Sequence, residues 1–449
     1  MQKDHSHTFI KFFKALLSLS VILLALFFFI YPGVVSLSLL WDDQLRSTGE
    51  SRLVQRWFPS VAGRYEEWAT QYLKSQYAIK ICHDAIAETE WPMFGSVFFL
   101  VTASELHQRK QIDASQGKIR KAVTLAAQVV ASPDTATWVR KKWGDEKYLT
   151  HQNVFYRMLL LMGLSAYEQM TGDRLYHALL TRQRLALADE LRQAKFNVLD
   201  DYPGECYPTD VLWAVVALQR AAKLDGTNCN DLAASLIKNL DRKLLAREGV
   251  PAFSVDAETG AIFQHGRGCG NSGILQFASE LDPTVASRWY EAHARHFWKD
   301  TGWAVGFTEV PRSMKSDFMD VDSGPVIFGF GSVASAFGIG AAKSVGRLDH
   351  AVPLEMEAIA CSWPTPFGLL IPGLMGKAAV DGWCLGETAI LFSITRPCQA
   401  SNITPFEGRA PGVVYLMIVF YFSIGFILIY FGKRLFPWSG RKTHVRPGG

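Results

Sequence analysis

Hydrophobic positions are concentrated in two uncharged runs, one near each end of the chain. The first run extends from Ala15 to Trp41 and the second from Ala410 to Gly432. A helix needs roughly 20 apolar residues to cross the hydrocarbon core of a bilayer, and both runs are long enough. The pattern therefore predicts transmembrane helices over 15–41 and 410–432, on either side of a large central domain, 42–409.

Basic residues flank both runs on the sides that face the chain termini. They are Lys3, Lys11 and Lys14 before the first run, and Lys433, Arg434, Arg441, Lys442 and Arg446 after the second. Because positive charge stays on the cytoplasmic side, we expect the tails 1–14 and 433–449 in the cytoplasm and the central domain in the periplasm or outside the cell, with a bacterial inner membrane between them. A cleaved signal peptide is the alternative for the first run.

An apolar segment recurs six times in the central domain, each time after a polar residue. These polar residues lie roughly 60 residues apart, and they are Glu90, Asn153, Asp210, Asn271, Asp322 and Asp381. Asp and Asn are typical of helix N-termini, and Gly or Pro follows several of the segments where a helix would end. The pattern predicts six apolar helices.

More amphipathic segments separate the apolar ones, for example over 117–130, 175–195, 231–247 and 284–300. Apolar helices that alternate with amphipathic ones suit two concentric rings, with the apolar helices inside. The fold class expected is therefore all-α, an (α/α)6 barrel of six helix pairs. An irregular helical domain with accidental spacing is the alternative. Strand-like alternation is sparse, and the best candidate for a hairpin lies within 251–263.

Composition narrows the classes of function. The chain has 449 residues, 49% of them hydrophobic, and a formal charge of +4 without a basic stripe, so we expect no nucleic-acid partner. It contains neither a Walker-type loop nor a dinucleotide-binding glycine fingerprint. None of its seven cysteines has CxxC spacing, so we expect no zinc, and no other metal or cofactor. The expected partners are a small-molecule substrate and membrane lipid, and the oligomeric state stays open.

In a ring of six helix pairs, the starts of the inner helices meet at one end, where a cavity would collect the preceding loops. The loops before the third and fifth inner helices supply the predicted catalytic residues, which are Asp210, Glu205, Asp320 and Asp322. Carboxyls that share a water-poor cavity separate in pKa, so that one acts as an acid and another as a base. The plainer alternative is that Asp210, Asn153 and Asp322 are N-caps that contribute about 1 kcal/mol each.

The remaining loops supply the predicted substrate-binding residues. They are Glu90, Trp91, Trp143, Asp145, Asn153, Tyr156, Cys206, His265, Cys269 and Asn271. Cys206 and Cys269 could form a disulfide across the mouth, act as thiols, or be unrelated buried cysteines. His265 could carry a proton or be merely solvated. The aromatic residues could form the walls of a pocket or fill the core, which is their commoner role.

Several short stretches at these loops carry a likeness to a known family. They are Trp143-Gly144-Asp145, Asn153 to Arg157, Tyr167, Thr171-Gly172-Asp173, Ala252-Phe253, Thr259-Gly260-Ala261, and Asp320 to Gly324. Over most of residues 80–350 the chain resembles the linalool dehydratase/isomerase family. The resemblance implies an (α/α)6 barrel and a cofactor-free hydration, dehydration and isomerisation of a small terpene alcohol.

The chain departs from the family pattern at its reactive residues. The family histidine, three residues after the tyrosine matched by Tyr156, corresponds here to Leu159. The family cysteines correspond to Asp201 and Asp210, and Cys206 is nearby but out of register. A His/Cys site has thus become an acidic one, so the terpene reaction is not carried over.

Together, these features predict a membrane-anchored, linalool dehydratase/isomerase-like enzyme. It would be a cofactor-free lyase or isomerase that acts by acid–base catalysis on a small alcohol or a lipid-derived substrate. One alternative is a carbohydrate-active, glycoside hydrolase-like (α/α)6 enzyme, because acidic loops with aromatic walls also suit sugars. A second alternative is a non-catalytic binding protein of the cell envelope.

Overall fold

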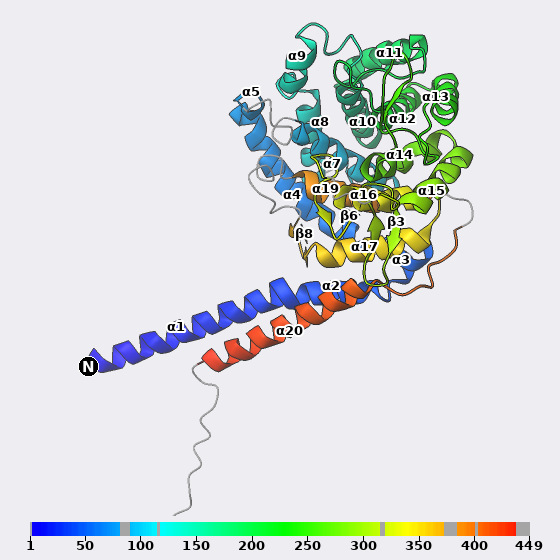
Figure 1. Cartoon of the computed structure of the whole chain (residues 1–449). Coiled ribbons are helices and arrows are strands. Elements are labelled where there is room, and N and C mark those ends of the chain that lie inside the picture. The colour runs from blue at the N-terminus through cyan, green and yellow to red at the C-terminus, as the bar shows by residue number, and fades with distance from the viewer. Residues whose placement is uncertain are drawn as a thin grey trace, which may run out of the picture.

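The computed structural model describes residues 2–80, 90–114, 117–314, 319–371, 384–399 and 403–436. Most of this part of the chain is helical, its strands are few and short, and a long apolar helix lies near each end (Figure 1). The prediction of a mainly helical protein with two long apolar terminal helices is confirmed.

Six helices form a closed cycle of contacts in which each packs against two others. In the order of the cycle they are α7 (Trp91–Gln108), α10 (Val154–Thr171), α12 (Pro208–Leu224), α14 (Gly268–Leu281), α16 (Ser332–Ser344) and α19 (Cys384–Thr395), which returns to α7. We call them the inner helices. Every side chain from Tyr156 to Glu168 in α10 is buried, as expected for a helix that is apolar all round. All six lie at the predicted apolar segments.

A second set of helices packs on the outside of the inner helices. They are α4 (Arg52–Ser75), α8 (Gly117–Ala131), α11 (His177–Gln193), α13 (Asn230–Arg242), α15 (Pro283–Phe297) and α17 (Leu348–Cys361). In α13 the buried residues Leu232, Leu236 and Leu240 recur every fourth position, while Asp231 and Lys238 are exposed. This amphipathic pattern is the one that predicted an outer layer.

The predicted capping roles of two polar residues are wrong. Asp210 is the third residue of α12, whose N-cap residue, Tyr207, makes no side-chain capping bond. Asn153 does occupy the N-cap position of α10, but its amide nitrogen donates to the carbonyl oxygen of Tyr148 at 2.7 Å instead of capping the helix. Helix capping therefore does not explain either polar side chain.

In the described part of the chain, four two-stranded antiparallel hairpins join the helices. They are β1 (Ser254–Val255) with β2 (Ile262–Gln264), β3 (Trp298–Asp300) with β4 (Val305–Phe307), β5 (Val326–Ile327) with β6 (Phe330–Gly331), and β7 (Pro364–Thr365) with β8 (Gly368–Leu369). The first confirms the predicted hairpin. The third separates Asp322 from α16, so the predicted capping role of Asp322 is wrong.

Asp381, the predicted start of the sixth apolar helix, lies outside the described residues. Short helices α3 (Asp43–Thr48), α5 (Tyr77–Lys80) and α9 (Thr137–Trp143) complete the domain.

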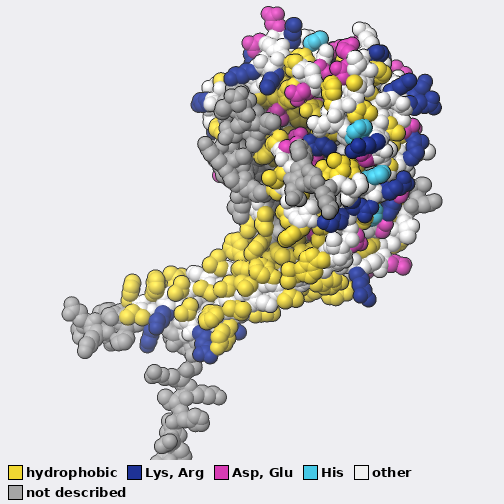
Figure 2. Space-filling model, in the orientation of Figure 1, with side chains coloured by type: hydrophobic (Ala, Val, Ile, Leu, Met, Phe, Trp, Pro, Cys, Tyr) yellow, Lys and Arg dark blue, Asp and Glu magenta, His cyan; other side chains and the backbone are white. Residues whose placement is uncertain are grey.

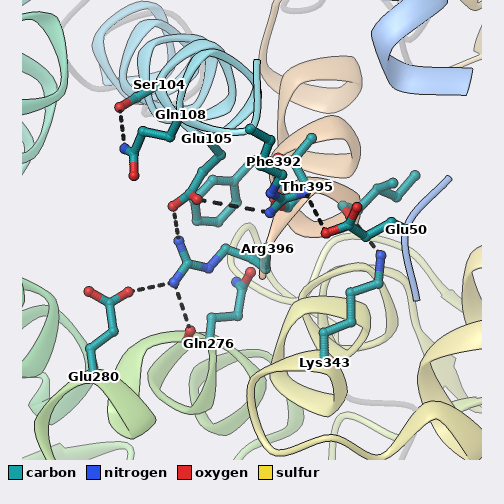
Figure 3. Close-up of polar contacts among 12 residues, drawn as sticks. Glu50, Ser104, Glu105, Gln108, Gln276, Glu280, Lys343, Phe392, Thr395 and Arg396 are labelled. Atoms are coloured by element: carbon teal, nitrogen blue, oxygen red, sulfur yellow. Dashed lines mark hydrogen bonds and ion pairs between the residues drawn. The ribbon is translucent and has the colours of Figure 1, made fainter. Parts of the chain in front are cut away.

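The C-terminal ends of the inner helices are tied together by a buried ion-pair network (Figure 3). Arg396, which follows α19, donates to Glu105 of α7 at 3.0 Å and to Glu280 of α14 at 2.6 Å. Arg220 of α12 donates to Glu280 at 2.8 Å. Two guanidinium groups thus neutralise two carboxylates, and four of the six inner helices meet in one network.

The terminal helices pair with each other and extend away from the domain (Figure 1). α1 (Gln2–Ala25), a π-helical segment (Leu26–Ile30) and α2 (Tyr31–Leu39) run antiparallel to α20 (Gly412–Leu435). Gly425 packs against Ile30 and Gly432 against Ile22, since small residues let two helices approach closely. The apolar spans are Phe9–Leu39 and Gly412–Leu435, slightly displaced from the predicted 15–41 and 410–432.

Candidate active site

Acidic side chains gather where the inner helices begin. We define the acidic cluster as Glu90, Asp201, Tyr202, Asp210 and Asp322. Glu90 directly precedes α7, Asp201 and Tyr202 lie in the loop before α12, Asp210 lies in the first turn of α12, and Asp322 lies in the loop that leads to β5. The cycle of inner helices therefore brings together carboxyls that are more than 200 residues apart in sequence.

Glu90 is half-buried and bonded to a tyrosine. The hydroxyl of Tyr202 donates to Oε1 of Glu90, across the space between α7 and the loop before α12. Burial raises the pKa of Glu90 to about 7, and the charge of Asp322 adds to this effect while the hydrogen bond from Tyr202 opposes it. Glu90 is thus poised to take or give a proton near neutral pH. The sequence singled out Glu90 but contained no signal for its tyrosine partner.

Asp210 carries the more strongly perturbed carboxyl. Its pKa is raised to about 8, mainly by burial and to a smaller extent by the charges of Asp322 and Glu90. A helix N-terminus favours a negative charge, so the position of Asp210 in the first turn of α12 acts in the opposite direction. Desolvation and like charge outweigh the helix dipole here. At pH 7 Asp210 therefore holds a proton in the folded protein.

Asp201 is the most deeply buried member of the cluster, with 1% of its surface exposed. Its Oδ2 accepts the backbone N–H of Tyr207 at 3.0 Å, and its Oδ1 has no hydrogen-bond partner among the described residues. Burial and the neighbouring Asp210 raise the pKa of Asp201 well above its usual range. The sequence pointed to Asp201 only through the family alignment, because nothing in a run of loop carboxylates tells which one becomes buried.

Asp322 and Glu205 are the exposed carboxylates at the edge of the cluster. Desolvation by the surrounding protein raises the pKa of Asp322, and the charge of Asp320 contributes. Oε2 of Glu205 accepts a hydrogen bond from the hydroxyl of Tyr207 at 3.1 Å. Both carboxylates are accessible to solvent, unlike Asp201.

Asp320 has a structural partner that the sequence did not indicate. Arg267 donates from both Nη atoms to the two carboxylate oxygens of Asp320, each at 2.9 Å, and from Nε to Oε1 of Glu309 at 2.7 Å. Partial burial alone would raise the pKa of Asp320, but the ion pair with Arg267 lowers it. A carboxylate held in a bidentate pair is a poor proton acceptor. Two neighbouring predicted residues thus differ: Asp320 is held in an ion pair, whereas Asp322 forms no ion pair with the residues that the structure describes.

The two predicted site cysteines have free thiols, so the predicted disulfide between them is not formed. The thiol of Cys269 donates to Oε1 of Glu309 at 3.1 Å. Burial, together with nearby carboxylates, raises the pKa of both Cys206 and Cys269 well above the usual range. A thiol that stays protonated is a weak nucleophile, so neither side chain fits a thiolate role.

Three of the predicted substrate-binding residues make structural contacts. Nε1 of Trp143 donates to the carbonyl oxygen of Asp201 at 3.0 Å and so holds the loop before α12 against α9. Asn271 donates from Nδ2 to the carbonyl oxygen of Pro251 at 2.9 Å. Tyr156 is buried in the core with its ring against Trp138, which is the core-filling role rather than that of a pocket wall.

The other predicted substrate-binding residues divide by their exposure. Trp91, the first residue of α7, is half-buried next to Glu90. Asp145 forms an ion pair with Arg140 at 2.7 Å and is 74% exposed. His265 is exposed, and its Nδ1 lies 3.4 Å from the backbone nitrogen of Arg247. Trp91 therefore remains close to the acidic cluster, while Asp145 and His265 face solvent.

No group of three or more His, Cys, Asp or Glu side chains is placed to hold a metal ion in the described part of the chain. A surface hollow of about 470 Å³ lies beside the loop before α12 and is lined, among others, by His151, Asp200 and Asp256. This loop also carries Asp201 and Tyr202, but no residue of the acidic cluster lines the hollow. The arrangement of the cluster itself suits proton transfer, because half-buried carboxyls with raised pKa values lie beside a more exposed one.

Comparison with known proteins does not assign the chain to a family. No protein-family model matches the chain, and no curated protein has a matching sequence.

Proposed function

We propose that the chain is a membrane-anchored enzyme that removes or moves a hydroxyl group by acid–base catalysis. Its substrate would be a small alcohol or a lipid-derived alcohol, and its reaction a cofactor-free dehydration or isomerisation of the linalool dehydratase/isomerase type. The acidic cluster is the active site, with Asp210 and Glu90 as proton donors and Asp322 and Glu205 as bases.

The fold that we propose for the domain is an (α/α)6 barrel. Two observations support it: the closed cycle of six buried helices and the amphipathic helices that pack on its outside. In such a barrel the active site lies where the inner helices begin, which is also where the acidic cluster lies.

The proposed location is a membrane, with both chain ends in the cytoplasm and the domain on the opposite side. The apolar spans have lengths of 31 and 24 residues, and each is sufficient to cross a bilayer core of about 30 Å. Because the helices pair antiparallel, their basic ends, at Lys11 and Lys14 and at Lys433 and Arg434, lie at the end of the pair that is remote from the domain (Figure 2). This arrangement agrees with the positive-inside rule.

The proposed reaction follows from the protonation states. Asp210 is neutral at pH 7 and gives its proton to the hydroxyl oxygen of the substrate, so that the C–O bond breaks and water leaves. A carboxylate, Asp322 or Glu205, takes a proton from the adjacent carbon, and the electron pair of that C–H bond forms the new double bond. In a dehydration the proton on the base returns to Asp210 through the cluster. In an isomerisation no C–H bond breaks: the water re-adds at another carbon of the cation, and the proton that it then releases returns to Asp210.

The observation that carries this proposal is the raised pKa of Asp210, about 8, in a half-buried position beside the more exposed Asp322. Its test is the Asp210→Asn variant of the full chain. Metabolite profiles of cells with and without the protein identify the substrate, and the purified chain is then assayed in lipid vesicles. Loss of a general acid costs about 10²–10⁴-fold in rate, so Asp210→Asn should lose at least a hundredfold in kcat while it folds normally.

The matched control is Asp189→Asn, which changes an exposed carboxylate on α11 that pairs with Arg192. This variant should retain full activity. If Asp210→Asn turns over substrate at the rate of the control, Asp210 is not the acid and the proposed mechanism is wrong.

A further inference from the structure

The domain packs against the side of α20 and not only against its end. Val414, Ile418 and Tyr421 are buried where α20 meets α17. The hydroxyl of Tyr421 donates to the carbonyl oxygen of Ala360, near the end of α17, at 2.8 Å. The first two turns of α20 and part of the third are therefore covered by the domain.

The part of α20 that extends beyond the domain is too short to cross a bilayer. Eleven residue steps separate Tyr421 from Gly432, the last residue before the charges of Lys433 and Arg434. At 1.5 Å per residue this is about 17 Å, against a hydrocarbon core of about 30 Å. If α20 spans the membrane, roughly the outer 13 Å of the core must surround both α20 and the part of the domain that covers it.

Aromatic residues support the same position of the outer membrane surface. Trp41, Trp303 and Tyr415 are exposed where the helix pair meets the domain, and the backbone N–H of Val413 donates to the carbonyl oxygen of Trp303 at 2.8 Å. Trp and Tyr are enriched at membrane–water interfaces. From Tyr415 to Lys433 the helix rises about 27 Å, close to the thickness of the core.

The β7–β8 hairpin contacts the terminal helices on the membrane side of the exposed aromatic residues Trp41, Trp303 and Tyr415. Pro32 has no N–H to offer the carbonyl oxygen of Phe28, four residues earlier, and the chain is π-helical here. Nε1 of Trp363 donates to that oxygen at 2.6 Å. An unsatisfied carbonyl is costly in lipid, so the domain completes the hydrogen bonding of the helix at a depth where water cannot.

The side chains at the surface of the same hairpin are apolar, and beside them Arg64, which pairs with the buried Glu387, donates to the carbonyl oxygen of Phe367 at 2.8 Å. Phe367 at its turn is 53% exposed and Ile371 is 39% exposed, and no charged residue occurs between Glu357 and Lys377. The ring of Phe367 lies 5.7 Å from that of Phe27. Figure 2 shows the hydrophobic surface of the helix pair continuing onto the adjoining side of the domain.

We infer that the β7–β8 hairpin, Trp363 to Ile371, is embedded in the outer leaflet, with the acyl chains of the bilayer as its partner. The inference rests on the proposed membrane anchoring and adds a point of insertion from the domain itself. The backbone N–H of Leu369 donates to Glu387 in the first turn of α19, so the hairpin lies at the same end of the inner helices as the acidic cluster.

The experiment places a photocrosslinking residue, p-benzoylphenylalanine, at one phenylalanine at a time in the full chain. The three positions are Phe367 in the hairpin, Phe426 on the projecting part of α20, and Phe263 on β2, and their exposed fractions are 53%, 61% and 60%. Each variant is reconstituted in phosphatidylcholine vesicles with radiolabelled acyl chains and irradiated. We expect lipid adducts at Phe426 and Phe367, each at least fivefold above Phe263.

The positions separate the two proposals. Adducts at Phe426 with Phe367 at the level of Phe263 would overturn the embedded hairpin and leave the membrane anchor intact. Absence of adducts at Phe426 would overturn the anchor, and the inference that depends on it. Equal adducts at all three positions would mean nonspecific adsorption of the domain to lipid and would also overturn the inference.

Discussion

The two ends of the inner helices bury acidic residues in opposite ways. At the C-terminal end, Arg396 pairs with Glu105 and Glu280 (Figure 3). Arg220 also pairs with Glu280. At the N-terminal end, the carboxyls of the acidic cluster face one another and a tyrosine. Burial alone would raise the pKa of Glu280, but the charges of the two arginines hold it at about 2, whereas Asp210 is raised to about 8.

Under the proposed function, the difference separates an end that stabilises the fold from an end that would carry the chemistry. Ionised, paired carboxylates hold helices together and exchange no protons near neutral pH. Neutral carboxyls that repel each other when charged lower the stability of the fold, and active sites are where such arrangements persist. The same residue types therefore have opposite roles because of their neighbours.

The largest effect is expected at the paired end. Arg396→Met should lower the free energy of unfolding by about 3–5 kcal/mol, because Glu105 and Glu280 lose a buried guanidinium. Denaturant unfolding of the detergent-solubilised chain measures the loss. The control Arg192→Met removes the exposed pair with Asp231 and should cost less than about 1 kcal/mol. Similar losses in the two variants would mean that the network contributes no more than a surface pair.

Asp210→Asn should have the opposite effect on stability. The folded pKa is raised to about 8, so between about pH 4 and pH 8 the folded protein binds a proton that the unfolded chain releases, and its stability falls as pH rises. The variant does not lose stability in this way, so its free energy of unfolding at pH 8 should exceed that of the parent protein by about 2 kcal/mol. This is less than the full pKa shift would give, because Asp210 is coupled to other carboxyls of the cluster. Unfolding at pH 4 and pH 8 tests the sign. A variant that is less stable than the parent protein at pH 8 would contradict the raised pKa.

The smallest effect is expected for Tyr202→Phe, which removes the hydroxyl that donates to Glu90. The hydrogen bond lowers the pKa of Glu90, so its loss should raise that pKa further. A hydrogen bond contributes about 1 kcal/mol, so the Glu90 limb of the pH–rate profile should move upward by about 0.7 of a pH unit. An unchanged profile with a lower kcat would assign Tyr202 a role in the reaction other than tuning Glu90.

The sequence predicted the helices better than the side-chain partners. Apolar periodicity located all six inner helices, because a helix buried all round must be apolar all round. It did not reveal the β5–β6 hairpin that displaces the start of α16, nor the pairing of Asp320 with Arg267, 53 positions away. The network of Arg396 and Glu105, 291 positions apart, was missed entirely. Partners so distant in sequence are brought together only by the closed cycle of helices.

For the candidate site, the sequence located the acidic loops but not the environment of each carboxyl. It singled out Asp210 and Glu90, which share the cluster, and also Asp145 and His265, which face solvent. Burial and neighbouring charge decide between these outcomes, and both depend on the folded arrangement.

The most direct test of the account is infrared spectroscopy of the carboxyl groups in the full chain. A protonated carboxyl has a C=O stretching band that a carboxylate lacks, and the difference between parent protein and variant assigns it to one residue. At pH 7 the parent protein should show a protonated band that Asp210→Asn removes, with a titration midpoint near pH 8. Identical spectra of the parent protein and Asp210→Asn in this band at pH 7 would show that Asp210 is already ionised, and would contradict the proposed role of the acidic cluster.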